Sequence, residues 1–333
     1  MTAALVLRGT APEAGWLAAR RKGVTASEIA TVLGLSPWDS PYSLFHRKLG
    51  VLPEREDSMA LALGRHLESF VADQFADRYP EFFWIFGDNG RALYAHPQRP
   101  WQLATPDRLL FEGASESWPI EDPPVAVLEC KTSASYDGWG DDGTDVIPVR
   151  YRCQVLWQMD VMQVTAGYLA CLFLHSRQLR VYQLALDEDA KQDLEVMRAA
   201  AKAFLGRIVV GVPPPVDWRP ATTATLKALH PSVEDRSAEV NAMPVIRYRA
   251  ACRAYKAAEQ RKKLAENRLR ELMGTARYAV LRGSHVTDRK GVRVPEVVAR
   301  RDVYDVKEHV RKASTVDKLV SVAAGTSRTG TPQ

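Results

Sequence analysis

The chain has 333 residues, with 45 Lys or Arg against 40 Asp or Glu and a formal net charge of +5. This length allows one large domain with an extension or two modest domains, and the slight basic excess favours an anionic partner. No apolar run approaches the length of a membrane span, and the start lacks the basic region of a signal peptide, so we expect a cytoplasmic protein. The four cysteines are too widely spaced for a zinc or iron-sulfur clamp.

The first elements predict a pair of short helices. One runs over about 16–22 and ends at Gly23, and the next has Thr25 as its N-cap with Glu28 three places later, which is a capping box. Ser27 then lies in a first helical turn, where unpaired N–H groups and the helix dipole favour an anion. With Arg20 close by in sequence, this segment is either a phosphate pocket or an ordinary capped helix with solvated arginines.

A turn-rich segment, 34–42, leads into a helix predicted over 43–49. The aromatic residues of that segment, which include Trp38, could stack on bases, although tethering of the loop to the core is the commoner use. Spacings of three and four then predict a long helix over 59–79, with Glu68 on its core-facing stripe. Glu68 is an edge residue, a partner of Arg65 or His66, or an additional metal-binding carboxylate.

Two strands are predicted at 82–86 and 91–94, separated by a turn at 87–90. Pro106 then marks a strand edge and is followed by Asp107. The apolar run that begins at Val125 predicts a buried strand, on which Glu129 and Lys131 share one face. Burying these charges at the end of a sheet costs free energy, which a divalent metal held by Asp107 and Glu129 would offset.

The polar, glycine-rich loop 132–145 has a length and composition that suit closure over a substrate. A helix is predicted over 151–162, where Gln154 and Gln158 share a face because they are four residues apart. Two strands at 166–174 and 179–184 and a helix over 187–209 complete this part of the chain.

The remainder reads as a linker followed by an extension. Residues 212–246 contain three consecutive prolines at 213–215 and are otherwise irregular, with one short helical candidate at 225–229. A long helix is predicted over 247–273, carrying nine Lys or Arg against three Glu, and ending at Gly274. This helix either lies along DNA or has a solvated face on a helical hairpin or subunit contact. A small β meander is expected over 280–301.

We therefore divide the chain into a catalytic domain (1–211), a linker (212–246), an extension (247–324) and a disordered tail (325–333). Without reference to any family, Asp107, Glu129 and Lys131, with Glu68 and Gln154 as candidates, suggest metal-assisted hydrolysis of a phosphodiester. Hard carboxylate oxygens suit Mg²⁺ or Mn²⁺. An Asp followed at a variable distance by Glu-x-Lys is a weak motif, because solvated Glu-x-Lys pairs are abundant.

The order of these elements resembles the PD-(D/E)XK nuclease core, and in more detail the YqaJ-type viral recombinases, a family that includes lambda exonuclease. The resemblance rests on six short segments in one order over roughly 14–184: Arg20 with 23–29, 34–41, Gly64 to Glu68, 105–107, 128–132 and 147–159. It implies a restriction-endonuclease-like α/β fold, with a mixed central sheet flanked by helices. The basic helix and small β extension would follow this core.

The resemblance also implies roles for individual residues. Asp107 and Glu129 would bind metal, Glu68 would assist, Lys131 would orient or activate water, and Gln154 would support the site. Arg20 and Ser27 match positions that hold a terminal 5′ phosphate.

The implied activity is 5′ to 3′ degradation of linear duplex DNA, which leaves a 3′ single strand for a partner annealing protein. A ring-shaped homo-oligomer is also implied, as is host-cell cytoplasm for a phage-encoded chain. The alternatives are a site- or structure-directed endonuclease of the same fold and a non-catalytic protein that binds DNA ends.

Overall fold

A computed structural model describes residues 3–53, 58–86, 92–112, 123–287 and 292–300. It divides into two compact units, Met1–Val233 and Glu234–Gln333. The elements of the first unit, in chain order, are β1 (Ala4–Leu7), α1 (Glu13–Arg21), β2 (Val24–Thr25), α2 (Ala26–Val32), α3 (Pro41–Lys48), α4 (Met59–Arg78), β3 (Phe82–Phe86), β4 (Leu93–His96), β5 (Arg99–Ala104), β6 (Arg108–Glu112), β7 (Ala126–Ser133), α5 (Val149–Met162), β8 (Ala166–Phe173), β9 (Gln178–Ala185), α6 (Glu188–Val210) and α7 (Pro220–Leu229). Every helix described is too short or too polar to span a bilayer.

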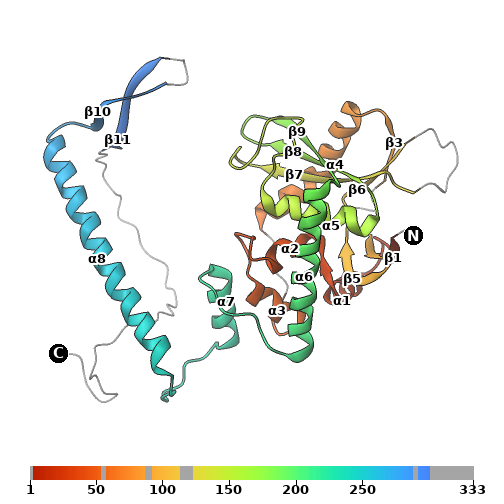
Figure 1. Ribbon diagram of the computed structural model, residues 1–333, viewed down its shortest axis with the longest axis horizontal. Coiled ribbons are helices and arrows are strands. Elements are labelled where there is room, and N and C mark those ends of the chain that lie inside the picture. The colour runs from red at the N-terminus through yellow and green to blue at the C-terminus, as the bar shows by residue number, and fades with distance from the viewer. Residues whose placement is uncertain (1–2, 54–57, 87–91, 113–122, 288–291, 301–333) are drawn as a thin grey trace. The chain divides into compact units, whose positions relative to one another are not determined.

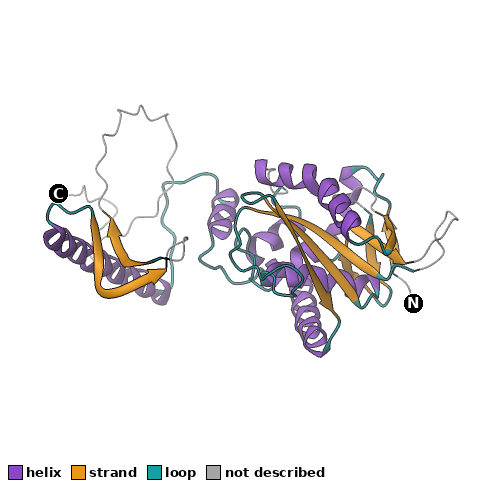
Figure 2. Ribbon diagram, turned by 90° about the horizontal axis from the view of Figure 1, so that it is seen from above, coloured by secondary structure: helices purple, strands orange, loops and turns teal. Residues whose placement is uncertain are grey.

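The central sheet has five strands in the order β3-β6-β7-β8-β9. β7 and β8 are parallel because α5 crosses between them, and the other neighbouring pairs are antiparallel. A second sheet, β1-β4-β5-β2, lies beside α5. Helices lie on both sides of the strands in Figure 2. The mixed α/β fold class is therefore confirmed, and α4, β6, β7 and α5 follow one another in the order expected from the sequence.

Helices cover the central sheet on both faces (Figure 1). Each face buries its own apolar cluster. On one face, Val71 and Phe75 of α4 pack against Leu128 of β7. On the other face, α5 and α6 cover alternate residues of the same strands. Gly167 permits this close approach, since a Cβ there would lie 2.6 Å from Val155 of α5.

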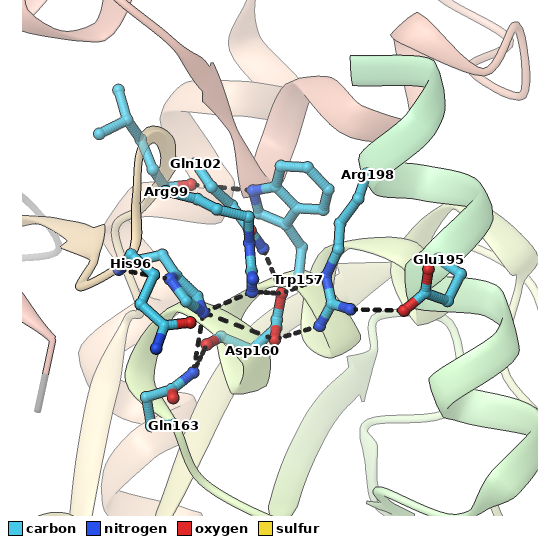
Figure 3. Close-up of polar contacts among 10 residues, drawn as sticks. His96, Arg99, Gln102, Trp157, Asp160, Gln163, Glu195 and Arg198 are labelled. Atoms are coloured by element: carbon cyan, nitrogen blue, oxygen red, sulfur yellow. Dashed lines mark hydrogen bonds and ion pairs between the residues drawn. The ribbon is translucent and has the colours of Figure 1, made fainter. Parts of the chain in front are cut away.

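A buried acid joins α5 to the second sheet (Figure 3). Asp160, near the end of α5, accepts two hydrogen bonds from Arg198 of α6 at 2.5 and 2.9 Å. It also accepts from Arg99 at 3.0 Å and from Gln102 at 2.6 Å, both on β5. Burial alone would raise the pKa of Asp160, but these hydrogen bonds and arginine charges outweigh it and the pKa is lowered. The carboxylate thus stays ionised and connects three elements.

The network predicts an acid sensitivity at His96, whose pKa burial and the nearby Arg99 lower to about 4. The folded protein keeps His96 neutral, whereas the unfolded chain takes up a proton below its ordinary pKa of 6.5. This contribution to stability is therefore complete above pH 6.5 and declines as the pH falls towards 4. When the pH is lowered from 7 to 5, the free energy of unfolding in urea should fall by about 2 kcal/mol more for the wild type than for His96→Asn. Equal losses would contradict this assignment.

Several boundaries differ from the predicted ones, and three strand segments, β1, β2 and β5, were not predicted. The turn predicted at 87–90 lies outside the described residues, as does the tail 325–333. The loop after β7, which was expected to close over a substrate, is held by hydrogen bonds to neighbouring elements. Its Gly140 carbonyl accepts from Arg180 at 2.7 Å, and Asp142 accepts from Arg78 at 2.8 Å. These contacts fix the loop to β9 and α4.

The segment 212–246, predicted to be a linker, is not one throughout. Pro220 begins α7, since its fixed backbone suits a first helical turn. The hydroxyl groups of Thr222 and Thr225, both buried, contact Ser40 at 2.8 Å and Ser43 at 2.7 Å. These contacts hold α7 against α3, so this part of the chain belongs to the first unit.

The second unit contains α8 (Ala242–Met273) and the hairpin formed by β10 (Tyr278–Thr287) and β11 (Arg293–Arg300). α8 begins five residues before the predicted start, because Pro244 falls in its first turn, where a missing N–H is tolerated. No described residue of α8 is buried. The predicted meander is a two-stranded hairpin within the described residues, and 301–324 of the predicted extension lies outside them.

Candidate active site

The central sheet places two acids beside each other, one just before β6 and one on the neighbouring strand β7. Asp107 directly precedes β6, and its Oδ2 accepts a hydrogen bond from the Cys130 backbone N–H of β7 at 2.8 Å. Glu129, one residue earlier on β7, is only 1 % exposed and points towards α5. The antiparallel pairing of β6 with β7 therefore brings together acids that are far apart in sequence.

The carboxylate of Glu129 is held by three donors. Gln154 and Gln158 of α5 donate to its two oxygens at 2.5 and 2.6 Å, and Lys131 forms an ion pair with it. The spacing of four residues on α5 explains why both amides reach the same carboxylate. This supporting role was predicted for Gln154 alone. Gln158 could have been included, because the two residues are four apart and share one helix face.

The electrostatics of this site favour a cation. Burial and the neighbouring Glu129 carboxylate raise the pKa of Asp107 well above its ordinary value. Burial alone would lower the pKa of Lys131, but the Glu129 and Asp107 carboxylates outweigh it and raise the pKa. Asp107 and Glu129 are two neighbouring acids with one ion-paired lysine, Lys131, and they form a donor set that fits a divalent cation. Mg²⁺ in particular is commonly held by one or two carboxylates plus phosphate oxygens and water.

Glu68 comes to the same place from α4, but it has a protein partner. Its Oε1 accepts from Arg108 Nη1 at 2.7 Å, and Arg108 also donates to the Asp107 carbonyl at 2.6 Å. Among the residues that the structure describes, no group of three or more His, Cys, Asp or Glu side chains is arranged to hold one metal ion. Direct metal binding by Glu68 therefore stays a prediction, while its contact with Arg108 links α4 to β6.

A second polar cluster forms at the start of α2. The predicted capping box is confirmed, with Thr25 N–H donating to Glu28 at 2.9 Å. Arg20 Nη2 donates to the hydroxyl of Ser27 at 3.0 Å, and its guanidinium lies 4.3 Å from the centre of the Trp16 ring. The arginine is thus stacked on Trp16 and aimed at the first turn of α2.

Lys48 fixes this cluster, and sequence reasoning missed it. Its ammonium group donates to the Arg20 and Gly23 carbonyls and to Glu28, each at 2.7 Å. Burial alone would raise the pKa of Glu28, but Lys48 and Arg20 outweigh it, so the pKa is lowered. Gly23 is required here, because a Cβ would lie 2.1 Å from the Trp101 carbonyl of β5.

One cleft of about 830 Å³ joins the two clusters. It is lined by all seven residues singled out from the sequence: Arg20, Ser27, Glu68, Asp107, Glu129, Lys131 and Gln154. The cleft also exposes residues not selected from the sequence, among them Arg150 and Tyr151 of α5. A chain entering it would meet the Arg20 cluster and the paired acids in the same space.

Comparisons with known proteins agree with the family resemblance. Residues 15–168 match the model of the YqaJ-like viral recombinase domain. The uncharacterized protein YqaJ of Bacillus subtilis (strain 168) is 28% identical over 228 residues, which cover 67% of this chain and 65% of that protein. The chain thus spans slightly less than two thirds of this curated relative.

Two solved structures are similar at low identity. An alkaline exonuclease from Laribacter hongkongensis is 17% identical, with a TM-score of 0.44 over 66% of this chain and 100% of the other. A phage-related exonuclease from Haemophilus somnus 129PT is 9% identical, with a TM-score of 0.37 over 57% of this chain and 96% of the other.

Proposed function

We propose that the protein is a metal-dependent DNA exonuclease, and the match of residues 15–168 to the model of the YqaJ-like viral recombinase domain supports this proposal. It hydrolyses linear duplex DNA from 5′ ends and leaves 3′ single-stranded tails for recombination by strand annealing. The observation that carries the proposal is the single cleft that contains both the paired acids and the Arg20 cluster. The first can serve phosphodiester hydrolysis, and the second can recognise a terminal phosphate.

Asp107 and Glu129 would hold Mg²⁺, for which Mn²⁺ can substitute. The bound metal would activate water and neutralise negative charge on the phosphate. Gln154 and Gln158 keep the Glu129 carboxylate in one orientation, since each oxygen accepts an amide hydrogen. Lys131, beside Glu129, has N–H groups that orient the attacking water. The ion pair of Glu68 with Arg108 positions the strand that follows Asp107.

The Arg20 cluster would bind the 5′ phosphate. Arginine forms strong, charge-assisted hydrogen bonds to phosphate, and the Ser27 hydroxyl together with the first N–H groups of a helix adds further donors. Lys48 holds the carbonyls on which the orientation of Arg20 depends. This arrangement accounts for a preference for DNA ends rather than for internal sites.

The proposed product, a 3′ single-stranded tail, indicates which kind of partner protein would act next. A 3′ single strand is the substrate of an annealing protein, so we propose that such a protein acts after this one. A ring-shaped homo-oligomer around the duplex would retain the substrate between successive cleavages. Both parts of the proposal come from the resemblance to the YqaJ-type viral recombinases.

A comparison of linear with closed circular duplex DNA tests the proposal. With Mg²⁺ present, linear 5′-phosphorylated DNA should release mononucleotides and circular DNA should stay intact. Equal hydrolysis of the circle would favour an endonuclease of the same fold. Binding of ends without hydrolysis would favour a non-catalytic end-binding protein.

We expect Arg20→Ala to reduce the preference for 5′-phosphorylated ends. Hydrogen bonds to charged groups contribute about 1.5–3 kcal/mol, so hydrolysis of the phosphorylated end should fall about 10- to 100-fold. A 5′-hydroxyl end makes no such contact, and its slower hydrolysis should change little. Initial rates on the two ends, measured for the wild type and the variant, give this ratio. An equal loss on both ends would show that Arg20 does not bind the terminal phosphate.

A further inference from the structure

A stack of rings and one guanidinium group runs from the core to the rim of the cleft. Trp139 is buried, and its ring centre lies 5.4 Å from that of Tyr151. The guanidinium carbon of Arg150 lies 4.4 Å from the centre of the Tyr151 ring and 4.7 Å from that of Trp38. Trp38 is 55% exposed and ends the stack. Arg150 is therefore clamped between two aromatic rings.

The loop that carries Trp38 is fixed even though its ring is exposed. On its other side, Arg219 donates to the carbonyl groups of Gly34 and Ser36. Ser40, at the end of the loop, is fully buried against Thr222 of α7. Tyr42 tethers the loop to the core as expected, whereas Trp38 does not. The backbone on both sides of Trp38 is thus held in place, while its ring stays largely exposed.

Arg150 has a charge that the described residues leave unpaired. Its Nε is buried and has no hydrogen-bond acceptor among them. Two other cations in the cleft have carboxylate partners, Arg47 with Asp39 and Lys131 with Glu129. Arg150 is also the second residue of α5, and a cation in the first turn of a helix is disfavoured by the dipole. Such a placement indicates an anion supplied by a ligand.

We infer that Arg150 binds a phosphate of the DNA strand at or beside the scissile bond, and that Trp38 and Tyr151 hold its guanidinium plane in position. This inference rests on the proposed function. Arg150 and Gln154 share one face of α5, because they are four residues apart, and Gln154 contacts Glu129. Arg150 therefore stands one helical turn before a residue that contacts Glu129, and it lines the same cleft as the paired acids. Stacking covers its faces and leaves its N–H edge for the two oxygens of a phosphate.

The test is DNA binding without hydrolysis. A fluorescein-labelled, 5′-phosphorylated duplex is titrated with the full chain in EDTA at several NaCl concentrations, and fluorescence anisotropy gives Kd. Arg150→Gln should raise Kd about tenfold or more. It should also reduce the slope of log K against log salt by about 0.7–0.9, the value for one phosphate contact.

Arg152→Gln is a matched control on the same helix. Arg152 pairs with Asp193 at 3.1 Å and does not line the cleft, so removal of its charge should leave Kd and the salt slope unchanged. Equal behaviour of the two arginine variants would overturn the inference.

Trp38→Ala and Trp38→Phe test the clamp on an exposed position, where folding is not at risk. The alanine variant should weaken binding, and the phenylalanine variant should restore most of it. Weaker binding by Trp38→Ala with an unchanged salt slope in Arg150→Gln would overturn the inference, since Trp38 would then contact DNA without Arg150.

The proposed function can fail separately. If the wild type hydrolyses no DNA but its DNA binding depends on Arg150, the inferred phosphate contact stands and the proposed exonuclease function is wrong. If the wild type hydrolyses linear DNA and Arg150→Gln binds DNA as tightly as the wild type, the proposed function stands and the inferred phosphate contact is wrong.

Discussion

Glu129→Gln is expected to lower the rate of DNA hydrolysis by about 10³-fold. The change removes one of the two carboxylates that would hold the metal, and the loss of several kcal/mol of charge stabilisation corresponds to a factor of this size. The side chain keeps its shape, and amides that can rotate, Gln154 and Gln158, can still bond to it. Single-turnover hydrolysis of a linear duplex in Mg²⁺ measures the effect.

The matched control for this variant is Gln74→Ala, an exposed change on α4 away from the cleft. It should keep wild-type activity. Thermal unfolding should show that Glu129→Gln remains folded. If a folded Glu129→Gln keeps more than about a tenth of the wild-type rate, Glu129 is not a metal-binding residue of this reaction.

Asp160→Asn is expected to destabilise the first unit by about 3 kcal/mol. Removal of one partner from a buried ion pair leaves uncompensated charge, and here two arginines lose their shared carboxylate. The side chain of Asp160 is 8% exposed, whereas those of Arg99 and Arg198 are 25% exposed, which places the estimate at the low end of the usual range. Urea unfolding at pH 7 measures the loss.

Glu195→Gln is the control for the Asp160 prediction. Glu195 also pairs with Arg198, at 3.2 Å, but its side chain is 78% exposed. Solvent screens this pair, so its loss should cost less than about 0.5 kcal/mol. Similar effects of the two variants would show that the Asp160 network does not join α5 to the second sheet.

Local chemistry made parts of the site predictable. The capping box at Thr25 and Glu28 can be read from four consecutive residues, and alternation along a strand placed Glu129 and Lys131 on one face. The fold class came from the family resemblance that the order of these elements carries. Such features depend on neighbours in sequence, which a single chain displays directly.

Other features depend on contacts between distant segments. Lys48 reaches the Arg20 turn, and Arg150 meets Trp38, only after folding brings their elements together. β5 was missed because Arg99 and Pro100 interrupt its apolar pattern. The role of Asp160 was invisible for a related reason, since its partners come from β5 and α6.

The order in which labels leave a linear duplex tests the central claim most directly. A 5′-phosphorylated duplex, labelled on the 5′-terminal nucleotide of one strand and on the 3′-terminal nucleotide of the same strand, is incubated with the wild type and Mg²⁺. We predict release of the 5′ label as a mononucleotide first, with the 3′ label retained in single-stranded DNA. Release of the 3′ label first would contradict a 5′ to 3′ exonuclease. Internal cleavage that leaves both terminal labels on longer fragments would contradict it as well.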